Sequence, residues 1–339
     1  MELTRRDLMR YAGLAAAAMG LSQLQLSRAE DAIAAATTPP VIWLSGSGCT
    51  GCSISLLNAV NPSIDQVLTS AISLRYHPNI MAAAGDLAVA SARSTAQAGG
   101  HILVVEGAIP TGPAAGFCYV WDENGHSVTI ADAVLAMAAS ASTIIAVGSC
   151  AAFGGIPKTN SAAQVRSLAT HVNKPVINLP GCPTHPSWIT ATIVQLLAGS
   201  PIPLDSFRRP TSIYGRTVHS ICPRRETEEA SRFGQAGRCL EELGCKGPST
   251  HADCPSRKWN NGRSWCVAVN GLCIGCTEPT FPAFPLHHSE SPDAYPQPTP
   301  TPEPSVTPTP VPTPADPATY RLALPVIPAG TGSVASGAD

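Results

Sequence analysis

Short apolar stretches alternate with helical patterns between Pro39 and Pro201. The apolar stretches are rich in β-branched residues and predict strands at Val41 to Leu44, Ile72 to Tyr76, Ile102 to Val105, Ile144 to Val147 and Val176 to Leu179. Composition or periodicity predicts helices near Ser53 to Val60, Asp86 to Gln97, Ile130 to Ala139, Ala162 to His171 and Pro186 to Leu197. Such alternation favours an α/β fold, in which helices cover both faces of a parallel sheet.

Four cysteines follow the ends of predicted strands. Cys49 and Cys52 come after the first strand, Cys150 after the fourth and Cys182 after the fifth. Open α/β sheets bind their ligands at the edge where the parallel strands end. We therefore expect these four thiols, distant in sequence, to converge on one edge of the sheet.

The loop after the first strand also carries the spacing Gly46-x-Gly48-x-x-Gly51, the fingerprint of dinucleotide-binding folds. That interpretation needs an acidic residue closing the second strand to hold a ribose, and the segment ISLRYHPNI ends without one. A lone fingerprint is a weak signal. We expect the glycines instead to let the backbone pass close to a bulky inorganic centre.

The region after Pro210 has few apolar runs and a high density of metal-binding residue types. Its candidate ligands are His219, Cys222, Cys239, Cys245, Cys254, Cys266, Cys273 and Cys276. A segment so poor in apolar side chains needs metals or disulfides as staples. The candidates divide into two sets of four, as two iron–sulfur clusters would require. Zinc remains an alternative, since four cysteines, or three cysteines and a histidine, also bind zinc.

The amino-terminal residues have the features of an export signal. The sequence TRRDLMR at residues 4–10 is a twin-arginine pattern, followed by an alanine-rich apolar run to Leu26 and by A-x-A cleavage sites within residues 32–36. The alternative is a surface helix that happens to contain Arg-Arg. The twin-arginine route carries proteins that have already folded around a cofactor, which favours clusters over disulfides for the cysteines.

The carboxyl-terminal residues predict an extended linker. Proline, threonine and serine dominate residues 282–317, a composition typical of a stiff polyproline II segment that cannot build a core. The apolar patch beyond it is short and contains two prolines, so no membrane-spanning helix is expected there. A net charge of −2 with 13% charged residues argues against nucleic acid as a partner.

Six motifs stand in an order shared with one known family: CTGCS, EGAIPTG, GSCAAFGGIP, NLPGCP, ELGCKGP and CIGCTEPTFP. From Pro39 to Phe281 the chain resembles the small subunit of [NiFe] hydrogenases. The resemblance implies a flavodoxin-like, doubly wound parallel sheet at 37–205, a loop-rich iron–sulfur domain at 206–285, and a linker and tail at 286–339, after a signal peptide at 1–36. It also implies three clusters in a line, and a separate large subunit that carries the nickel–iron centre.

The resemblance assigns each cluster a ligand set. It implies a proximal [4Fe-4S] cluster held by Cys49, Cys52, Cys150 and Cys182. It implies a distal [4Fe-4S] cluster held by His219, Cys222, Cys239 and Cys245, with the histidine in the family's H-x-x-C position. The medial cluster would be held by Cys254, Cys266, Cys273 and Cys276.

Cys266 decides the type of the medial cluster. Many relatives have proline at this place, and their medial cluster is [3Fe-4S], because three thiolates leave the fourth iron without a protein ligand. Here the fourth thiolate is present, which predicts a medial [4Fe-4S] cluster with a potential near those of its neighbours. The alternative is a bystander thiol beside a [3Fe-4S] cluster.

Three glycines depart from patterns found in parts of the family. Oxygen-tolerant members carry two further cysteines around the proximal cluster, where this chain has Gly51 and Gly155, so their special cluster is not expected. Many members have an acidic residue before the first ligand cysteine, where Gly48 stands, so a proton route through that side chain is not expected. The segment GSGCTGCSISLLN, together with Cys266, is closer to the nickel–iron–selenium branch.

Two residues near the motifs have no assigned ligand role. Cys118 in GFCYVW matches no ligand position, and we expect a buried, inert thiol. Glu106 ends a predicted strand and is either structural or part of the interface with the large subunit.

The resemblance implies an electron-transfer subunit of a heterodimeric hydrogenase, an oxidoreductase in which the partner splits H2 and this chain supplies no catalytic residue. Electrons would pass from the proximal to the medial to the distal cluster, then to a c-type cytochrome or a membrane redox subunit. Ligand type, hydrogen bonds and burial would set the potentials. The expected location is the periplasm or the outer face of the cytoplasmic membrane.

Two other functions compete with this one. A thioredoxin-like redox protein would use Cys49 and Cys52, but that function leaves ten of the twelve cysteines unexplained. An exported structural protein stapled by zinc or disulfides would be colourless, without the visible absorption of iron–sulfur clusters.

Overall fold

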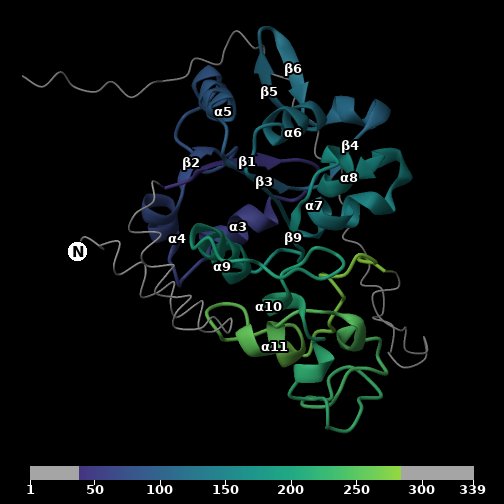
Figure 1. The fold of residues 1–339 in the computed structure, drawn as a ribbon. Coiled ribbons are helices and arrows are strands. Elements are labelled where there is room, and N and C mark those ends of the chain that lie inside the picture. Colours follow the sequence, from purple (N-terminus) through teal and green to yellow (C-terminus); the bar gives the residue numbers. More distant parts are fainter. Residues whose placement is uncertain (1–37, 284–339) are drawn as a thin grey trace, which may run out of the picture. The chain divides into compact units, whose positions relative to one another are not determined.

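The computed structural model describes residues 38–283, so the predicted signal peptide and the predicted linker and tail lie outside the described residues. Five parallel strands form the central sheet: β1 (Pro40–Ser45), β2 (Ser73–Tyr76), β3 (Ile102–Glu106), β7 (Thr143–Val147) and β9 (Ile177–Leu179). Their spatial order is β2-β1-β3-β7-β9, the flavodoxin-like order (Figure 1). The predicted fold class is confirmed.

Each predicted strand is present within one residue at either end. Along β1 the side chains alternate between two separate hydrophobic clusters, with Val41 and Trp43 in one and Ile42 and Leu44 in the other. Because both faces are buried, a central strand can be apolar at every position, and this is why the runs read as continuous in the sequence.

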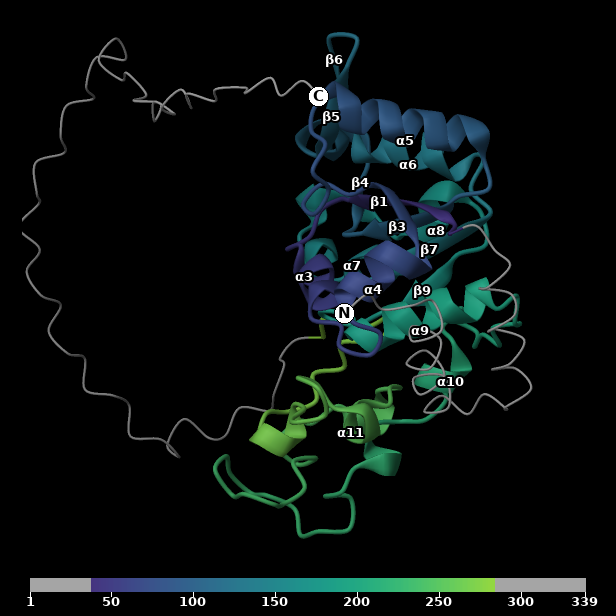
Figure 2. The ribbon, with the colours of Figure 1, turned by 90° about the vertical axis from the view of Figure 1, so that its left-hand side faces the viewer.

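Helices cover the two faces of the sheet separately (Figure 2). Trp43 and its neighbours pack against α3 (Gly51–Leu57) and α9 (Pro186–Leu197). The opposite face packs against α5 (Asp86–Ala98), α6 (Ile130–Ala138) and α8 (Leu168–Val172). Short elements complete this part of the chain: α4 (Ile64–Gln66), the π-helical turn Val67–Ala71, α7 (Ser149–Phe153) and the 3₁₀ turns Gly112–Phe117 and Ile156–Thr159.

The predicted helix at Ala162 to His171 is wrong. The chain instead forms a 3₁₀ turn at Ser161–Ala163, the short strand β8 (Val165–Arg166) and then α8. Gln164 adopts a left-handed conformation with φ +44°, which a helix cannot accommodate. Two-residue strands β4 (Ile109–Pro110) and β8 pair in antiparallel fashion, and the Ser167 hydroxyl then caps α8 by accepting the Thr170 N–H.

An antiparallel hairpin between the third sheet strand and α6 was not predicted. Its strands are β5 (Tyr119–Glu123) and β6 (His126–Thr129), joined by Asn124 and Gly125, both with positive φ. Asn-Gly is the strongest short-range signal for such a turn. The sequence therefore contained the information, although polar residues around the turn hid the strands.

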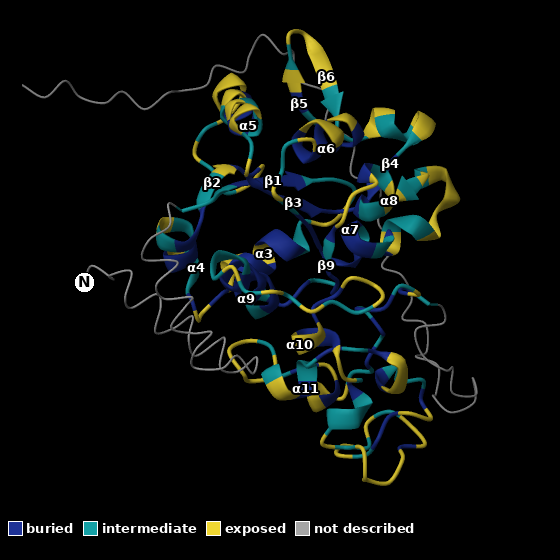
Figure 3. Cartoon of the chain, viewed as in Figure 1, coloured by how far each residue is buried: buried dark blue, intermediate teal, exposed yellow. Residues whose placement is uncertain are grey.

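The chain after Pro210 has little regular structure. It contains α10 (Thr211–Tyr214), α11 (Cys254–Arg257) and 3₁₀ turns at His219–Ile221, Gly247–Ser249 and Val267–Val269. Figure 3 shows exposed loops here beside a buried centre, and that centre continues the hydrophobic cluster of the α9 face through Leu240 and Trp265. None of the helices in the described part of the chain has the length and apolar character needed to cross a membrane.

Candidate metal centres

The carboxyl edge of the sheet brings four cysteines together. Cys49 lies in the turn between β1 and α3, Cys52 and Cys150 lie in the first turns of α3 and α7, and Cys182 follows β9. Burial, followed by repulsion from Cys182 and Cys49, raises the pKa of Cys150 to about 11. Burial, Glu106 and, more weakly, Cys150 raise the pKa of Cys52 to about 12. The four thiols therefore lie near enough to repel one another as thiolates.

Glycines make room for these thiols. A Cβ atom added at Gly148 would lie 2.7 Å from Cys52 Sγ, and one added at Gly155 would lie 2.7 Å from Cys150 Sγ. Gly155 also has φ +50°, so a cysteine at this position would be strained as well as crowded. The sequence expectation concerned Gly46, Gly48 and Gly51, and of these only Gly51 lies beside a candidate ligand, since a Cβ atom added there would lie 3.1 Å from Cys49 Sγ.

For Gly46 that expectation is wrong. A Cβ atom at Gly46 would lie 2.5 Å from the carbonyl oxygen of Ala108, so this glycine permits contact between two backbone segments and not with an inorganic centre. The contact continues as a bridge between Ser47 and Ala108, which aligns the loop after β1 with the loop after β3. The glycine fingerprint thus has a structural cause, and a phosphate cradle is not needed to explain it.

Glu106 supports the proximal loop from inside the protein. Its side chain is 3% exposed, and it accepts hydrogen bonds from Cys52 N (2.8 Å) and Ser53 N (3.1 Å) and from the Ser53 hydroxyl. Of the two roles expected for Glu106, this geometry supports the structural one. A buried carboxylate with three donors is well satisfied and holds the start of α3 against β3.

A second group of cysteines surrounds α11 and the turn at Val267–Val269. Burial, and after it the charges of Cys276, Asp253, Cys273 and Cys266, raises the pKa of Cys254 well above its usual value. Cys254 therefore has all three other predicted medial ligands as electrostatic neighbours. Cys266 is exposed as a residue, yet burial of its thiol, followed by repulsion from Cys245, raises its pKa.

A third group lies between the turns at His219–Ile221 and Gly247–Ser249. Ligand atoms of His219, Cys239 and Glu241 all lie within 4.8 Å of one another. Burial is the main cause that raises the pKa of Cys222, and Cys245 and Cys239 add to it. The predicted distal ligands thus lie together, with Glu241 as an additional carboxylate that sequence reasoning missed.

The three groups are linked in order, the second to the third also by a hydrogen bond from the Lys246 N–H to the Cys273 carbonyl oxygen (2.7 Å). The backbone N–H of Cys182 donates to the Cys276 thiol, and the Ser149 hydroxyl donates to the Cys276 carbonyl oxygen. These bonds join the first group to the second. Repulsion from Cys245 contributes to the raised pKa values of Cys266 and Cys273, which joins the second group to the third. The groups therefore form a continuous series with the medial one in the middle.

The chemistry of the donors fits metal clusters better than free thiols. All twelve cysteines lie within the described residues, and none of them is in a disulfide. A thiol redox motif needs a lowered thiolate pKa, whereas burial raises that of Cys52 to about 12. Thiolates gathered in groups of four repel one another unless cations lie among them, and such groups are the ligand sets of iron–sulfur clusters.

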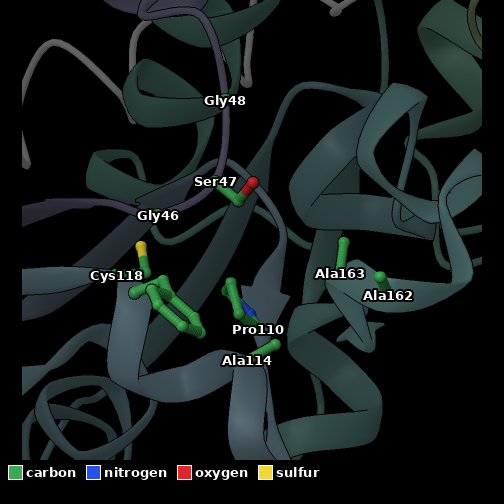
Figure 4. Close-up of a pocket in the computed structure, with 9 residues that line it drawn as sticks. Gly46, Ser47, Gly48, Pro110, Ala114, Cys118, Ala162 and Ala163 are labelled. Carbon is green, nitrogen blue, oxygen red and sulfur yellow. The ribbon is translucent and has the colours of Figure 1, made fainter.

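Cys118 lies apart from the three groups. It lines a surface hollow of about 320 Å³ together with Pro110 and Ala114 (Figure 4). Burial alone raises its pKa, so no charged group activates the thiol. The expectation of an inert thiol is supported, although Cys118 is half-buried and not fully buried.

Several supporting residues had no visible signal in the sequence. Thr184 is fully buried, its hydroxyl donates to the Leu179 carbonyl oxygen, and Cys52 Sγ lies 3.9 Å from that hydroxyl. His77 and Ser53 extend the hydrogen bonds of Glu106. Glu241 could have been suspected from its place in CLEELGC, between two candidate ligands. The others contact the site only through tertiary packing.

Family models match both parts of the chain. One described as NADH ubiquinone oxidoreductase, 20 Kd subunit, matches residues 49–196. Another, which describes the C-terminal part of the NiFe/NiFeSe hydrogenase small subunit, matches residues 214–286. The sheet is therefore shared with a second kind of oxidoreductase, and the carboxyl-terminal match is the more specific one.

Whole proteins are similar over nearly their full length. The periplasmic [NiFeSe] hydrogenase small subunit of Desulfomicrobium baculatum is 40% identical over 306 residues, 83% of this chain and 97% of that protein. The periplasmic [NiFe] hydrogenase small subunit 1 of Nitratidesulfovibrio vulgaris is 36% identical, over 82% of this chain and 90% of that protein. The solved structure of recombinant [NiFeSe] hydrogenase from Desulfovibrio vulgaris Hildenborough matches with a TM-score of 0.72 and 39% identity, over 75% of this chain and 99% of that one.

Proposed function

The chain belongs to the NiFe/NiFeSe hydrogenase small-subunit family, and we propose that it relays electrons between an H2-activating large subunit and an external carrier through three iron–sulfur clusters. The observation that carries this proposal is the ordered series of donor groups, joined by Cys182 to Cys276 and by Cys245 to Cys266 and Cys273. An electron relay needs such a series, whereas a single thiol redox site or isolated zinc staples do not. The hydrogenase active centre lies in the separate large subunit.

The proposed ligand sets follow the three groups. Cys49, Cys52, Cys150 and Cys182 hold the proximal cluster, and His219, Cys222, Cys239 and Cys245 hold the distal one. Cys254, Cys266, Cys273 and Cys276 hold the medial cluster. Bound iron–sulfur clusters supply one-electron redox chemistry, and the chain tunes it through hydrogen bonds, burial and nearby charge. We propose domain limits at 37–205 and 206–285 from the change in sequence pattern, and the two parts pack on one shared core through Leu240 and Trp265.

Anaerobic purification of the heterodimer tests the central proposal. We expect a brown protein with broad visible absorption, and iron in slight excess over acid-labile sulfide, because the partner's nickel–iron centre adds iron without sulfide. Cys150→Ser should lower both contents, and Cys118→Ser, a change at a cysteine outside the three groups, should lower neither. A colourless protein that contains zinc in place of iron would establish the competing structural role.

The medial cluster is proposed to be [4Fe-4S], because Cys254 has Cys266 among its charged neighbours. Electron paramagnetic resonance of the oxidised protein tests the type, since an oxidised [3Fe-4S] cluster is paramagnetic and an ordinary [4Fe-4S] cluster at that level is silent. We expect no stoichiometric three-iron signal in the native protein and a new one in Cys266→Pro. A full three-iron signal in undamaged native protein would reject the assignment.

The distal ligand set is tested by separating two activities. His219→Ala should slow dye reduction more than hydrogen-isotope exchange, because exchange needs only the partner's centre. Glu241→Gln is the matched control, since Glu241 Oε2 lies 3.7 Å from His219 Nε2 but is not a proposed ligand. Equal loss of both activities in His219→Ala would mean that His219 is structural.

We propose that the twin-arginine route exports the chain to the periplasm or to the outer face of the cytoplasmic membrane. The support is the twin-arginine pattern at residues 4–10 and the names of two relatives, both of which are described as periplasmic. Replacing Arg5 and Arg6 with lysines should leave cluster-containing protein in the cytoplasm, since the export receptor reads the arginine pair. Normal amounts of active enzyme outside the cytoplasm would contradict this. The proposed carrier there is a c-type cytochrome or a membrane redox subunit.

A further inference from the structure

A buried chain of hydrogen bonds runs away from the proximal loop and is not explained by the ligand assignment. It begins at Glu106, passes through the Ser53 hydroxyl and ends at His77, whose Nε2 lies 3.2 Å from Ser53 Oγ. His77 is 1% exposed and Ser53 is 2% exposed. Polar side chains buried this deeply need partners, and here each one is the partner of the next.

The direction of each hydrogen bond follows from the available donors. The Glu106 carboxylate only accepts, so the Ser53 hydroxyl donates its one proton to Glu106 and must accept from His77. The backbone N–H of Asn79 donates to His77 Nδ1 at 3.1 Å, so the ring proton resides on Nε2. His77 is therefore a neutral ring with one donor and one acceptor, both used. Burial lowers its pKa to about 4, which agrees with this form.

Packing fixes the position of the histidine ring. His77 directly follows β2, with its ring centroid 5.2 Å from that of Trp43 in β1. Its backbone N–H donates to the Met81 sulfur at 3.4 Å. The ring cannot move without disturbing the core, so it is a rigid donor for Ser53.

The carboxylate at the other end of the chain acts on a proposed proximal ligand. Glu106 accepts the backbone N–H of Cys52, so this N–H is engaged inside the protein and not with the thiols. Fewer hydrogen bonds to cluster sulfurs, and a nearby negative charge, both disfavour the reduced form of an iron–sulfur cluster. The orientation of Glu106 therefore bears directly on the proximal potential.

We propose that His77 is a positioning residue for the proximal cluster: through Ser53 it holds the Glu106 carboxylate against the Cys52 N–H and so keeps the proximal potential low. This inference rests on the proposed proximal ligand set. Without the His77 donor, the Ser53 hydroxyl is free to turn and Glu106 loses its third donor. Glu106 is then held less firmly against the Cys52 N–H, and loss of that carboxylate contact would favour the reduced form of the cluster that Cys52 helps to hold.

Redox titration of the anaerobic holoenzyme, followed by electron paramagnetic resonance, measures the potential of each cluster. In His77→Leu we expect the proximal potential to rise by about 59 mV, a tenfold change in a one-electron equilibrium, with the other clusters unchanged. His77→Gln keeps an N–H donor near the ring position and should restore the native value. Ser53→Ala breaks the same chain with less change in volume and should shift the potential in the same direction.

His101→Leu is the matched control, because His101 is fully buried in the opposite core, where its Nε2 contacts the Met137 carbonyl oxygen. It should lower stability without shifting any potential. If Ser53→Ala leaves the proximal potential unchanged, or if all clusters shift equally in His77→Leu, the positioning role is refuted. The iron and sulfide contents of the same samples test the ligand set separately. If a variant keeps its full iron and sulfide content and its proximal potential is unchanged, only the role of His77 is overturned.

Discussion

The sheet half of the chain (residues 40–197) and the cluster half (residues 210–283) hold their cysteines by different means. In the sheet half, the thiols lie just beyond the ends of strands whose positions are set by apolar packing on both faces. In the cluster half, Cys254 begins α11 and the other cysteines lie on loops, and the longest helices, α10 and α11, have four residues each. Apolar burial can thus place the proximal thiols before any metal binds, whereas bound metal must help to order the others.

A few buried contacts join the two halves. Arg209 is 2% exposed and pairs with Asp205 (2.8 Å) on one side and Glu278 (3.0 Å) on the other, where it also donates to the Thr277 carbonyl oxygen. Its guanidinium lies over the rings of Phe207 and Tyr214. The loop after Cys276 is thereby tied to the segment that leaves the sheet half. The contrast between the halves, and the strength of this tie, can be measured.

Removal of iron should produce the largest difference between the halves. In chelator-treated protein we expect amide hydrogen-exchange protection to collapse across residues 214–276, because binding energy in such sites is folding energy on the order of several kcal/mol. Protection in β3 and β7 should persist, since their side chains remain buried without metal. Equal loss of protection in both halves would show that the sheet also depends on its cluster.

Arg209→Met should produce the second-largest effect, a loss of stability. It removes a buried cation and leaves Asp205 and Glu278 without their partner, so we expect the free energy of unfolding to fall by about 3–5 kcal/mol. The control is Arg93→Met, which removes a pair with Glu123 whose side chains are each 29% exposed, and should cost less than about 1 kcal/mol. Urea titration of both variants gives the comparison, and similar small losses would mean that Arg209 does not join the halves.

Gly155→Ala tests how tightly the sheet half surrounds its thiols. The new Cβ atom would lie 2.7 Å from both Cys150 N and Sγ, so we expect a loss of about 2–4 kcal/mol and reduced iron content. Gly100→Ala has a similarly positive φ, +73° against +50°, but has no atom within 4 Å of the added Cβ. It should cost about 1 kcal/mol, measured as a smaller fall in melting temperature, with full iron content. Matching losses would show that backbone strain alone matters at Gly155.

The contact between His185 of the sheet half and Lys258 of the cluster half should make the free energy of unfolding depend on pH. His185 Nε2 donates to the Lys258 carbonyl oxygen (2.7 Å), and its Nδ1 accepts the Ser187 N–H at the start of α9. Burial lowers the pKa of His185 from 6.5 to about 4. The unfolded chain therefore binds a proton between these values, so the contribution to stability is complete above about pH 6.5 and is lost as pH falls toward 4.

His185→Gln removes this titration and can still donate to Lys258. Between pH 7 and 4 its unfolding free energy should fall by about 1–3 kcal/mol less than that of the native chain. Urea titrations at several pH values measure the difference. Parallel pH profiles for the two proteins would mean that His185 is not buried as a neutral ring.

The predictability of each half from sequence differed for a physical reason. Strands such as β3 could be predicted because burial on both faces demands apolar residues at every position. The helix expected at Ala162 to His171 failed because a left-handed Gln164 and the pairing of β8 with β4 depend on neighbours distant in the chain. In the cluster half, periodicity carried almost no information, and the cysteine motifs alone indicated its organisation.

In the candidate site, the ligands could be predicted from the sequence, whereas the residues that support them could not. Residues that bind soft metals are chemically distinctive, so Cys254 or Cys273 could be named as candidates without coordinates. Glu106, Ser53 and His77 are ordinary residue types, and nothing in their spacing showed that they meet. Glu106 in particular could have faced a partner, and only its hydrogen bonds to Cys52 and Ser53 placed it inside.

The family, the α/β pattern, the convergence of thiols at strand ends and the candidate ligands could all be predicted from the amino-acid sequence, because they depend on residue type and local spacing. Which supporting side chains surround the thiols, and why Gly46 and Gly155 must be glycine, became clear from the folded chain alone. These features arise from contacts between segments more than 100 residues apart, such as Ser149 with Cys276, which are 127 residues apart. A local pattern cannot encode such contacts, because each depends on how the whole core packs.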